Sequence, residues 1–241
     1  EIKRDVDKMY VILPFEKDFY EKKHHYPVEF VGHPLIDAIH NHPTMDAALF
    51  RKENQLNDKP IIAILPGSRK QEITKMLSVM LSVVPDFPDY QFVIAGAPSL
   101  EHSFYEQFII NENIKFISNK TYDLLNNATA ALVTSGTATL ETALFKVPEV
   151  VCYKGSSISY QIAKRIITLK YISLVNLIMD EEVVTELIQG DCNTKRIREE
   201  LKKILDTNYR QNLLEKYEVL EEKLGGIGAS EKTARLIVQS L

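Results

Sequence analysis

Cysteine is scarce in this chain, because Cys152 and Cys192 are the only two among 241 residues. Two thiols so far apart in the sequence do not make a disulfide framework, and such sparse use is typical of a reducing compartment. No apolar run is long enough to span a bilayer as a helix, and we expect no signal peptide. These absences exclude a disulfide-stapled scaffold and a membrane-spanning helix.

An excess of basic charge is also lacking. The 29 lysines and arginines are outnumbered by 33 aspartates and glutamates, which gives a net charge of −4. Because a nucleic-acid binder needs a basic face, we expect no nucleic-acid partner. The hydrophobic share of 45% and the charged share of 26% are those of a soluble globular protein. The chain has no internal repeat and no low-complexity segment.

Short apolar runs alternate with helical patterns over the first two thirds of the chain. Strands are predicted at residues 9–13, 28–31, 61–65, 91–95, 114–117, 130–134 and 150–153, with helical segments between most of them. This alternation predicts an α/β fold, a Rossmann-like doubly wound sheet of parallel strands with right-handed crossovers. The last third predicts helices over 159–168, 195–205, 210–224 and 230–241, the last capped by Ser230.

A first candidate binding loop follows the strand predicted at residues 61–65. Gly67 and Ser68 form a turn, Arg69 comes next, and a helix begins directly after it. The free N–H groups at the start of a helix bind anions, and an arginine can hold a phosphate with two hydrogen bonds. The loop lacks the Lys-Ser/Thr ending of a P-loop and the glycine spacing of a dinucleotide site. The pattern therefore indicates either a phosphate site or an ordinary strand–helix turn with a solvated arginine.

A second loop of the same kind follows the strand predicted at residues 130–134. Ser135, Gly136 and Thr137 open a helix, and Glu141 lies one turn further along it. A carboxylate beside a phosphate site suits a neutral diol such as a ribose. Taken alone, Thr137 also fits a helix cap and Glu141 a favourable first-turn acid. The two loops together predict a site for a nucleotide with its sugar.

Five motifs occur in order along the chain, and together they resemble lipid-A-disaccharide synthases. They are LPFE at 13–16, FVGHPL at 30–35, LPGSR at 65–69, SGTATLE at 135–141, and YISLVNLI followed by VVTELIQ between 171 and 189. The resemblance covers nearly the whole chain. It implies the C-terminal, nucleotide-binding domain of a GT-B glycosyltransferase with a helical C-terminal extension. The implied reaction of lipid A biosynthesis transfers 2,3-diacylglucosamine from UDP-2,3-diacylglucosamine to 2,3-diacylglucosamine 1-phosphate and releases UDP.

The resemblance also implies roles for single residues. Arg69 is the implied catalytic residue, because it would stabilise charge growing on the departing diphosphate. Three residues have a second interpretation. Asn176 and Gln189 fall at positions that line the donor site in the family, but they also fit a local turn residue and a surface side chain. His33 lies at the inter-domain crossing and fits either a direct role or a structural histidine. No Asp-x-Asp motif lies near either loop, so we expect no metal and no cofactor. The implied substrate-binding residues are Gly67, Ser68, Arg69, Ser135, Gly136, Thr137, Glu141, Asn176 and Gln189.

Nothing in residues 1–30 matches the motifs of the family's N-terminal domain, which include the candidates for the catalytic base. The resemblance therefore implies a remnant of that domain and an inter-domain crossing at residues 1–33, and a UDP-sugar-binding domain at 34–241. We expect the chain alone to be incomplete and inactive as a transferase.

The resemblance implies a cytoplasmic protein of a Gram-negative bacterium, peripheral on the inner face of the inner membrane. A helix at 159–168 with basic residues nearby fits either a membrane-facing patch or a core-facing helix with a solvated side. The sequence does not decide between a monomer and a homodimer. The residues of this candidate patch are Ile158, Ile162, Ile166, Ile167, Lys164, Arg165 and Lys170.

Three other interpretations stay open at this point. The chain could belong to another GT-B enzyme that uses UDP-N-acetylglucosamine, such as a transferase or an epimerase, although the VGHP and VNLI segments argue against this. It could be a non-catalytic UDP-binding fragment. It could also be an α/β interaction domain in which the paired loops are a coincidence.

Overall fold

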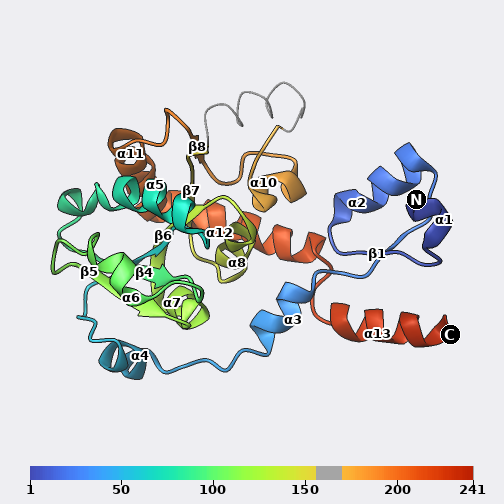
Figure 1. Ribbon diagram of the computed structural model, residues 1–241, viewed down its shortest axis with the longest axis horizontal. Coiled ribbons are helices and arrows are strands. Elements are labelled where there is room, and N and C mark those ends of the chain that lie inside the picture. Colours follow the sequence, from blue (N-terminus) through green and yellow to red (C-terminus); the bar gives the residue numbers. More distant parts are fainter. Residues whose placement is uncertain (156–169, 241) are drawn as a thin grey trace. The chain divides into compact units, whose positions relative to one another are not determined.

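The computed structural model describes residues 1–155 and 170–240 and divides the chain into two compact units. Unit 1 combines Glu1–His42 with Lys216–Leu241, and unit 2 is Pro43–Glu215 (Figure 1). The helix predicted at 159–168, with most of its candidate membrane patch, lies outside the described residues. The domain boundary predicted after residue 33 stays a prediction.

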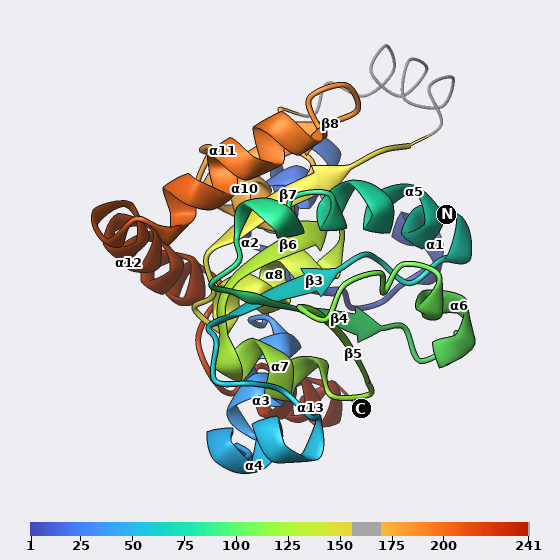
Figure 2. The ribbon, with the colours of Figure 1, turned by 90° about the vertical axis from the view of Figure 1, so that its left-hand side faces the viewer.

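A six-stranded parallel sheet forms the centre of unit 2, in the order β5-β4-β3-β6-β7-β8 (Figure 2). β3 and β6 are neighbours, and the strand order runs outward from this pair in opposite directions. Such a reversal opens a crevice at the carboxyl ends of the two central strands, where doubly wound folds bind their ligands. The strands are β3 (Ile61–Leu65), β4 (Gln91–Gly96), β5 (Ile114–Ser118), β6 (Ala128–Thr134), β7 (Glu149–Tyr153) and β8 (Glu186–Ile188).

Helices cover both faces of this sheet. α5 (Lys70–Leu81) and α11 (Thr194–Leu205) contact each other and β7 on one face, and α7 (Thr121–Asn127) lies on the other (Figure 2). Because both faces are covered, a central strand must be apolar along its whole length. β3 meets this condition, since every one of its residues is buried. The other helical elements of unit 2 are α4 (Ala47–Glu53), η2 (Val84–Asp86), α6 (His102–Glu106), α8 (Thr137–Leu144), α10 (Leu174–Met179) and the first part of α12 (Thr207–Lys223).

The core on the α7 face shows the alternation of a strand. Ile61, Ala63 and Leu65 of β3 pack there with Phe50 of α4 and Leu124 of α7. The intervening residues of β3 therefore point to the α5 face. This two-sided packing fixes β3 and β6 and with them the loops that leave their carboxyl ends.

Unit 1 consists of short elements. β1 (Tyr10–Val11) pairs in parallel with β2 (Glu29–Phe30). The second part of α12 also belongs to this unit. Its other elements are α1 (Ile2–Asp5), α2 (Pro14–Asp18), the π-helix η1 (Phe19–Lys23), α3 (Pro34–His40) and α13 (Ala229–Gln239).

The start of α13 differs from the predicted cap. Its N-cap position is Gly228, and Ser230 lies inside the helix. The buried carboxylate of Asp37 in α3 instead accepts the N–H groups of Gly228 and Ser230 at 2.6 and 2.8 Å. The prediction of Ser230 as the cap was wrong because the carboxylate that satisfies these donors comes from a distant part of the chain.

The structure contains elements that the sequence did not predict, namely α3, α10 and the short strand β8. β8 has only three residues, of which Leu187 alone is buried, so its pattern is too short to stand out. Between β4 and β5 the helical segment is limited to α6, and Ile110 beyond it is 86% exposed.

Candidate functional site

The two predicted loops meet at the carboxyl ends of β3 and β6 and line one cavity of about 260 Å³. The adjacent end of β4 closes its third side. The cavity is lined by Leu65, Pro66, Gly67, Ser68, Glu72, Ala95, Gly96, Ala97, Pro98, Thr121, Thr134, Ser135, Gly136, Thr137, Ala138 and Glu141. Six of the predicted substrate-binding residues are thus brought together, and they come from segments about 70 residues apart.

The first loop depends on its glycine. Gly67 has a φ of +102°, in the region that favours glycine, and an added Cβ would lie 3.1 Å from a carboxylate oxygen of Glu72. Arg69 is the residue before α5, so the first N–H groups of that helix follow the loop directly. The loop can therefore present backbone donors close to a ligand.

Arg69 lies outside the lining of the cavity in this structure. Its guanidinium donates to Glu72 Oε1 at 3.1 Å, and its side chain is 82% exposed. Arg69 is not among the lining residues, whereas Glu72 is. An ion pair this exposed contributes little free energy, so the arginine can exchange Glu72 for an anionic ligand at small cost. The sequence missed Glu72 because a first-turn acid is so common in helices.

The second loop is held at Ser135. Its N–H donates to the Cys152 carbonyl at 3.3 Å, and its hydroxyl donates to the Ile172 carbonyl at 2.9 Å. The hydroxyl proton is therefore engaged within the protein. Gly136 precedes α8, and an added Cβ there would meet nothing within 4 Å. The N–H groups of Thr137 and Ala138 open α8 and precede its first backbone bonds, whereas that of Thr139 donates to the Gly136 carbonyl at 3.2 Å.

Glu141 lies one turn into α8 and faces a tyrosine. The hydroxyl of Tyr122 on α7 donates to Glu141 Oε1 at 3.3 Å. Burial raises the pKa of Glu141 above its ordinary value, and the hydrogen bond from Tyr122 opposes this only in part. Burial and the neighbouring carboxylate raise the pKa of Tyr122 to about 12. Tyr122 therefore stays a hydrogen-bond donor that orients Glu141, a role that the sequence did not predict.

Asn176 of α10 is fully buried and does not line the cavity. Its amide oxygen accepts the N–H groups of Val183 and Val184 at 2.8 and 2.9 Å. Its amide nitrogen donates to the Val184 carbonyl and to Glu186, each at 2.9 Å. The geometry thus gives Asn176 a structural task, the folding of the connection from α10 to β8, and its contact with a substrate stays a prediction.

Gln189 follows β8 and is also absent from the cavity lining. Its φ is +52°, and its N–H donates to the Tyr153 carbonyl at 2.8 Å, which continues the pairing of β7 with β8. Its contact with a substrate likewise stays a prediction. In unit 1, His33 caps α3 by accepting the Leu35 N–H on Nδ1 at 3.2 Å, and burial lowers its pKa.

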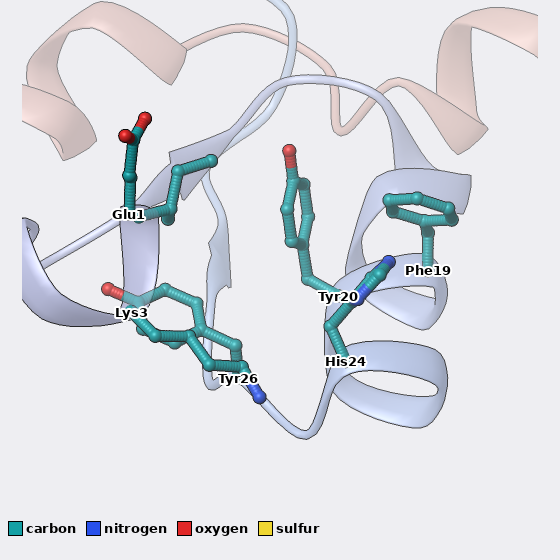
Figure 3. A pocket seen from close by; sticks show the side chains of 7 residues that line it. Glu1, Lys3, Phe19, Tyr20, His24 and Tyr26 are labelled. Carbon is teal, nitrogen blue, oxygen red and sulfur yellow. The ribbon is translucent and has the colours of Figure 1, made fainter.

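A second cavity, of about 530 Å³, lies within unit 1 (Figure 3). It is larger than the cavity between the loops but contains none of the predicted site residues. The rings of Phe19 and Tyr20 meet edge to face there, with centroids 5.3 Å apart. The cavity between the loops carries the convergent backbone donors and the carboxylates, so we take it as the candidate site. Among residues 1–155 and 170–240, no group of His, Cys, Asp and Glu side chains is placed to hold a metal ion.

Solved structures share this architecture and define its class. The UDP-GlcNAc 2-epimerase from Neisseria meningitidis bound to UDP-GlcNAc superimposes with a TM-score of 0.64 over 96% of this chain and 61% of its own, at 15% identity. WaaG, a glycosyltransferase involved in lipopolysaccharide biosynthesis, gives a TM-score of 0.55 over 95% of this chain and 62% of its own, also at 15% identity. At such identities the likeness concerns the fold alone, and that fold is GT-B.

The family follows from the sequence comparisons. The family model for lipid-A-disaccharide synthetase matches residues 1–238, so this chain belongs to that family. A lipid-A-disaccharide synthase of Coxiella burnetii (strain CbuG_Q212) is 37% identical over 243 residues, and one of Geobacter sulfurreducens is 36% identical over 248. These matches cover 98% and 100% of this chain, which spans 64% of the length of each relative. The resemblance inferred from the five motifs is thereby confirmed.

Proposed function

We propose that this chain supplies the UDP-binding part of a hexosyltransferase of lipid A biosynthesis. The proposed reaction transfers 2,3-diacylglucosamine from UDP-2,3-diacylglucosamine to 2,3-diacylglucosamine 1-phosphate and releases UDP. The observation that carries the proposal is the cavity itself, in which two strand–loop–helix termini and the carboxylates of Glu72 and Glu141 converge across the switch point of the sheet. The family membership and the curated relatives support the choice of substrates.

The proposed binding mode follows the chemistry of the lining residues. The N–H groups that open α5 and α8 bind the diphosphate, helped by the positive ends of the helix dipoles. Thr137 and Ser68 add hydroxyl groups at the same loops. Glu141, oriented by Tyr122, accepts hydrogen bonds from the ribose hydroxyls.

The proposed mechanism stabilises the leaving group. As the bond between the sugar C1 and the diphosphate breaks, negative charge grows on the β-phosphate. Arg69 would leave Glu72 and turn to that phosphate, where a bidentate contact places two N–H donors on the developing charge. The backbone donors of the two loops act in the same direction. None of the lining residues is assigned as the base for the acceptor hydroxyl.

We further propose a peripheral location at the cytoplasmic face of the inner membrane, where both lipid substrates would be available. In the described part of the chain, no helix combines the length and the apolarity needed to cross a bilayer. Flotation with vesicles of anionic phospholipid tests the location, and recovery of the protein only in the unbound fraction would contradict it.

The test of the transferase function is a thin-layer assay with both lipid substrates, with and without a separately expressed N-terminal domain of a curated relative. We expect disaccharide and UDP to form only when this chain and the added domain are both present. Disaccharide made by this chain alone would support the reaction but contradict the expected need for a second domain. The alternative is a non-catalytic UDP-binding protein. UDP binding without disaccharide in either mixture would favour it.

A further inference from the structure

Glu186, the first residue of β8, is the centre of a hydrogen-bonded cluster beside the candidate site. Its carboxylate accepts the backbone N–H groups of Ile172 and Ser173, both at 2.9 Å. It also accepts the Ser173 hydroxyl at 2.7 Å and the Asn176 amide at 2.9 Å. Three of these donors meet Oε1, and the Ile172 N–H meets Oε2. The cluster therefore fixes the backbone turn that leads into α10.

This cluster is linked to the second loop through one peptide group. The N–H of Ser173 donates to Glu186 Oε1 at 2.9 Å, and the carbonyl of the same peptide group, that of Ile172, accepts the hydroxyl of Ser135 at 2.9 Å. Ser135 is the last residue before Gly136 and the N-terminus of α8. The position of the Ile172 carbonyl thus sets where the loop begins.

We propose that Glu186 is a positioning residue for the diphosphate-binding loop at Ser135, Gly136 and Thr137. This inference rests on the proposed function, because it assumes that the loop binds the diphosphate of UDP. Glu186 does not line the cavity, so it acts through Ile172 and Ser135 and does not touch the ligand. A glutamine is an imperfect replacement, since its NH₂ group would face at least one N–H donor, that of Ile172 at Oε2.

The test measures the affinity of the chain for UDP and for uridine by calorimetry, together with thermal stability. Glu186→Gln is expected to lower the affinity for UDP about 10-fold and the affinity for uridine less than about 2-fold, because the proposed loop contacts are to the phosphates. Ser135→Ala already removes the hydrogen bond to the Ile172 carbonyl. In that background, Glu186→Gln is expected to lower the affinity for UDP by less than about 2-fold.

Glu200→Gln is the matched control. Glu200 is another buried carboxylate of unit 2; it accepts the Thr185 hydroxyl at 3.0 Å and does not line the cavity. We expect this variant to lose thermal stability while keeping the UDP affinity of the parent protein. A merely structural role for Glu186 predicts that both variants behave alike.

Each outcome bears on the proposal. UDP affinity unchanged by Glu186→Gln, or weakened equally in both backgrounds, overturns it. If Glu186→Gln does not fold, Ser173→Ala serves instead, because it removes one hydroxyl donor to Glu186. We expect it to lower the affinity for UDP about 3-fold without changing the affinity for uridine. An unchanged affinity for UDP in this variant overturns the proposal. A parent protein that does not bind UDP overturns the proposed function, and this inference with it.

Discussion

At the scale of single residues, the carboxylate of Glu141 is the group whose protonation should govern recognition of the ribose. Its pKa is raised chiefly by burial, so protonation begins at a higher pH than for an exposed glutamate. Only the ionised form accepts hydrogen bonds on both oxygens. We therefore expect uridine affinity to fall as the pH is lowered from about 8 to about 5.

Glu141→Gln should weaken uridine binding and remove this pH dependence. Uridine serves as the ligand because it has no phosphate that titrates in the same range. Calorimetric titrations at several pH values provide the measurement, with 2′-deoxyuridine as a control that has lost half of the diol. Equal binding of uridine and 2′-deoxyuridine to the parent protein would show that the proposed diol contact is wrong.

Arg69 is expected to act on the phosphates alone. Arg69→Ala should weaken the binding free energy of UDP by roughly 1.5–3 kcal/mol and leave that of uridine nearly unchanged, because the charged contact needs a phosphate. Loss of the exposed pair with Glu72 should cost little stability. Lys75→Ala, which removes an exposed cation from the same helix, is the control. The same loss for UDP and uridine would indicate that Arg69 has a structural role.

Glu149 at the start of β7 should make the free energy of unfolding decline as the pH rises. It is fully buried, and neither of its oxygens has a hydrogen-bond partner in the described part of the chain. Burial, and then the charge of Glu186, raise its pKa well above the ordinary value. A raised folded-state pKa contributes stability below the unfolded-state value, and this stability is lost as the pH rises through the folded-state value.

Glu149→Gln should therefore flatten the decline in the free energy of unfolding between about pH 5 and about pH 8, by roughly 1 kcal/mol or more. Urea denaturation at several pH values measures it. Glu112→Gln removes an exposed carboxylate and should leave the profile of the parent protein unchanged. Parallel profiles for Glu149→Gln and the parent protein would show that Glu149 stays ionised or finds a partner.

At the scale of elements, Asp37 joins α3 to the start of α13 within unit 1. The N–H groups of Gly228 and then Ser230 lower the pKa of Asp37. A lowered pKa contributes stability above the unfolded-state value, and this stability is lost as the pH falls through the folded-state value. Asp37→Asn should thus cost about 1–2 kcal/mol at neutral pH and much less below about pH 3.

Urea denaturation followed by circular dichroism at both pH values tests the role of Asp37. Asp18→Asn is a suitable control, since Asp18 forms an exposed pair with Lys22. If the two substitutions had equal effects at neutral pH, Asp37 would not be the anchor of α13.

The sequence predicted the elements whose patterns are local. β3 and its loop were visible because a strand buried on both faces is a continuous apolar run that ends at a glycine turn. Short β8 and α10 were missed because β8 has only three residues and the hydrogen bonds of Glu186 and Asn176 in this region span 10 to 13 residues. Tyr122 was missed for the same reason, because its contact with Glu141 spans 19 residues and two helices. Nine substrate-binding residues were predicted, but the sequence did not reveal which of them line the cavity, as six do.

At the scale of the whole molecule, the proposed function makes unit 2 a UDP-binding domain whose selectivity would divide between two groups of contacts. In the proposed binding mode, the loop amides and Arg69 would recognise any diphosphate, and Glu141 would recognise the ribose. Neither group identifies the base. Ala95, Ala97 and Pro98 line the cavity at the end of β4, and the proposed donor UDP leads us to expect a preference for uracil over a purine.

The most direct test of the central claim is a calorimetric titration of the chain with UDP and with ADP, each with EDTA present. We predict saturable binding of UDP that EDTA does not change, and binding of ADP that is at least about 10-fold weaker. Absence of UDP binding, or UDP binding that disappears with EDTA, would contradict the account of a metal-independent UDP site.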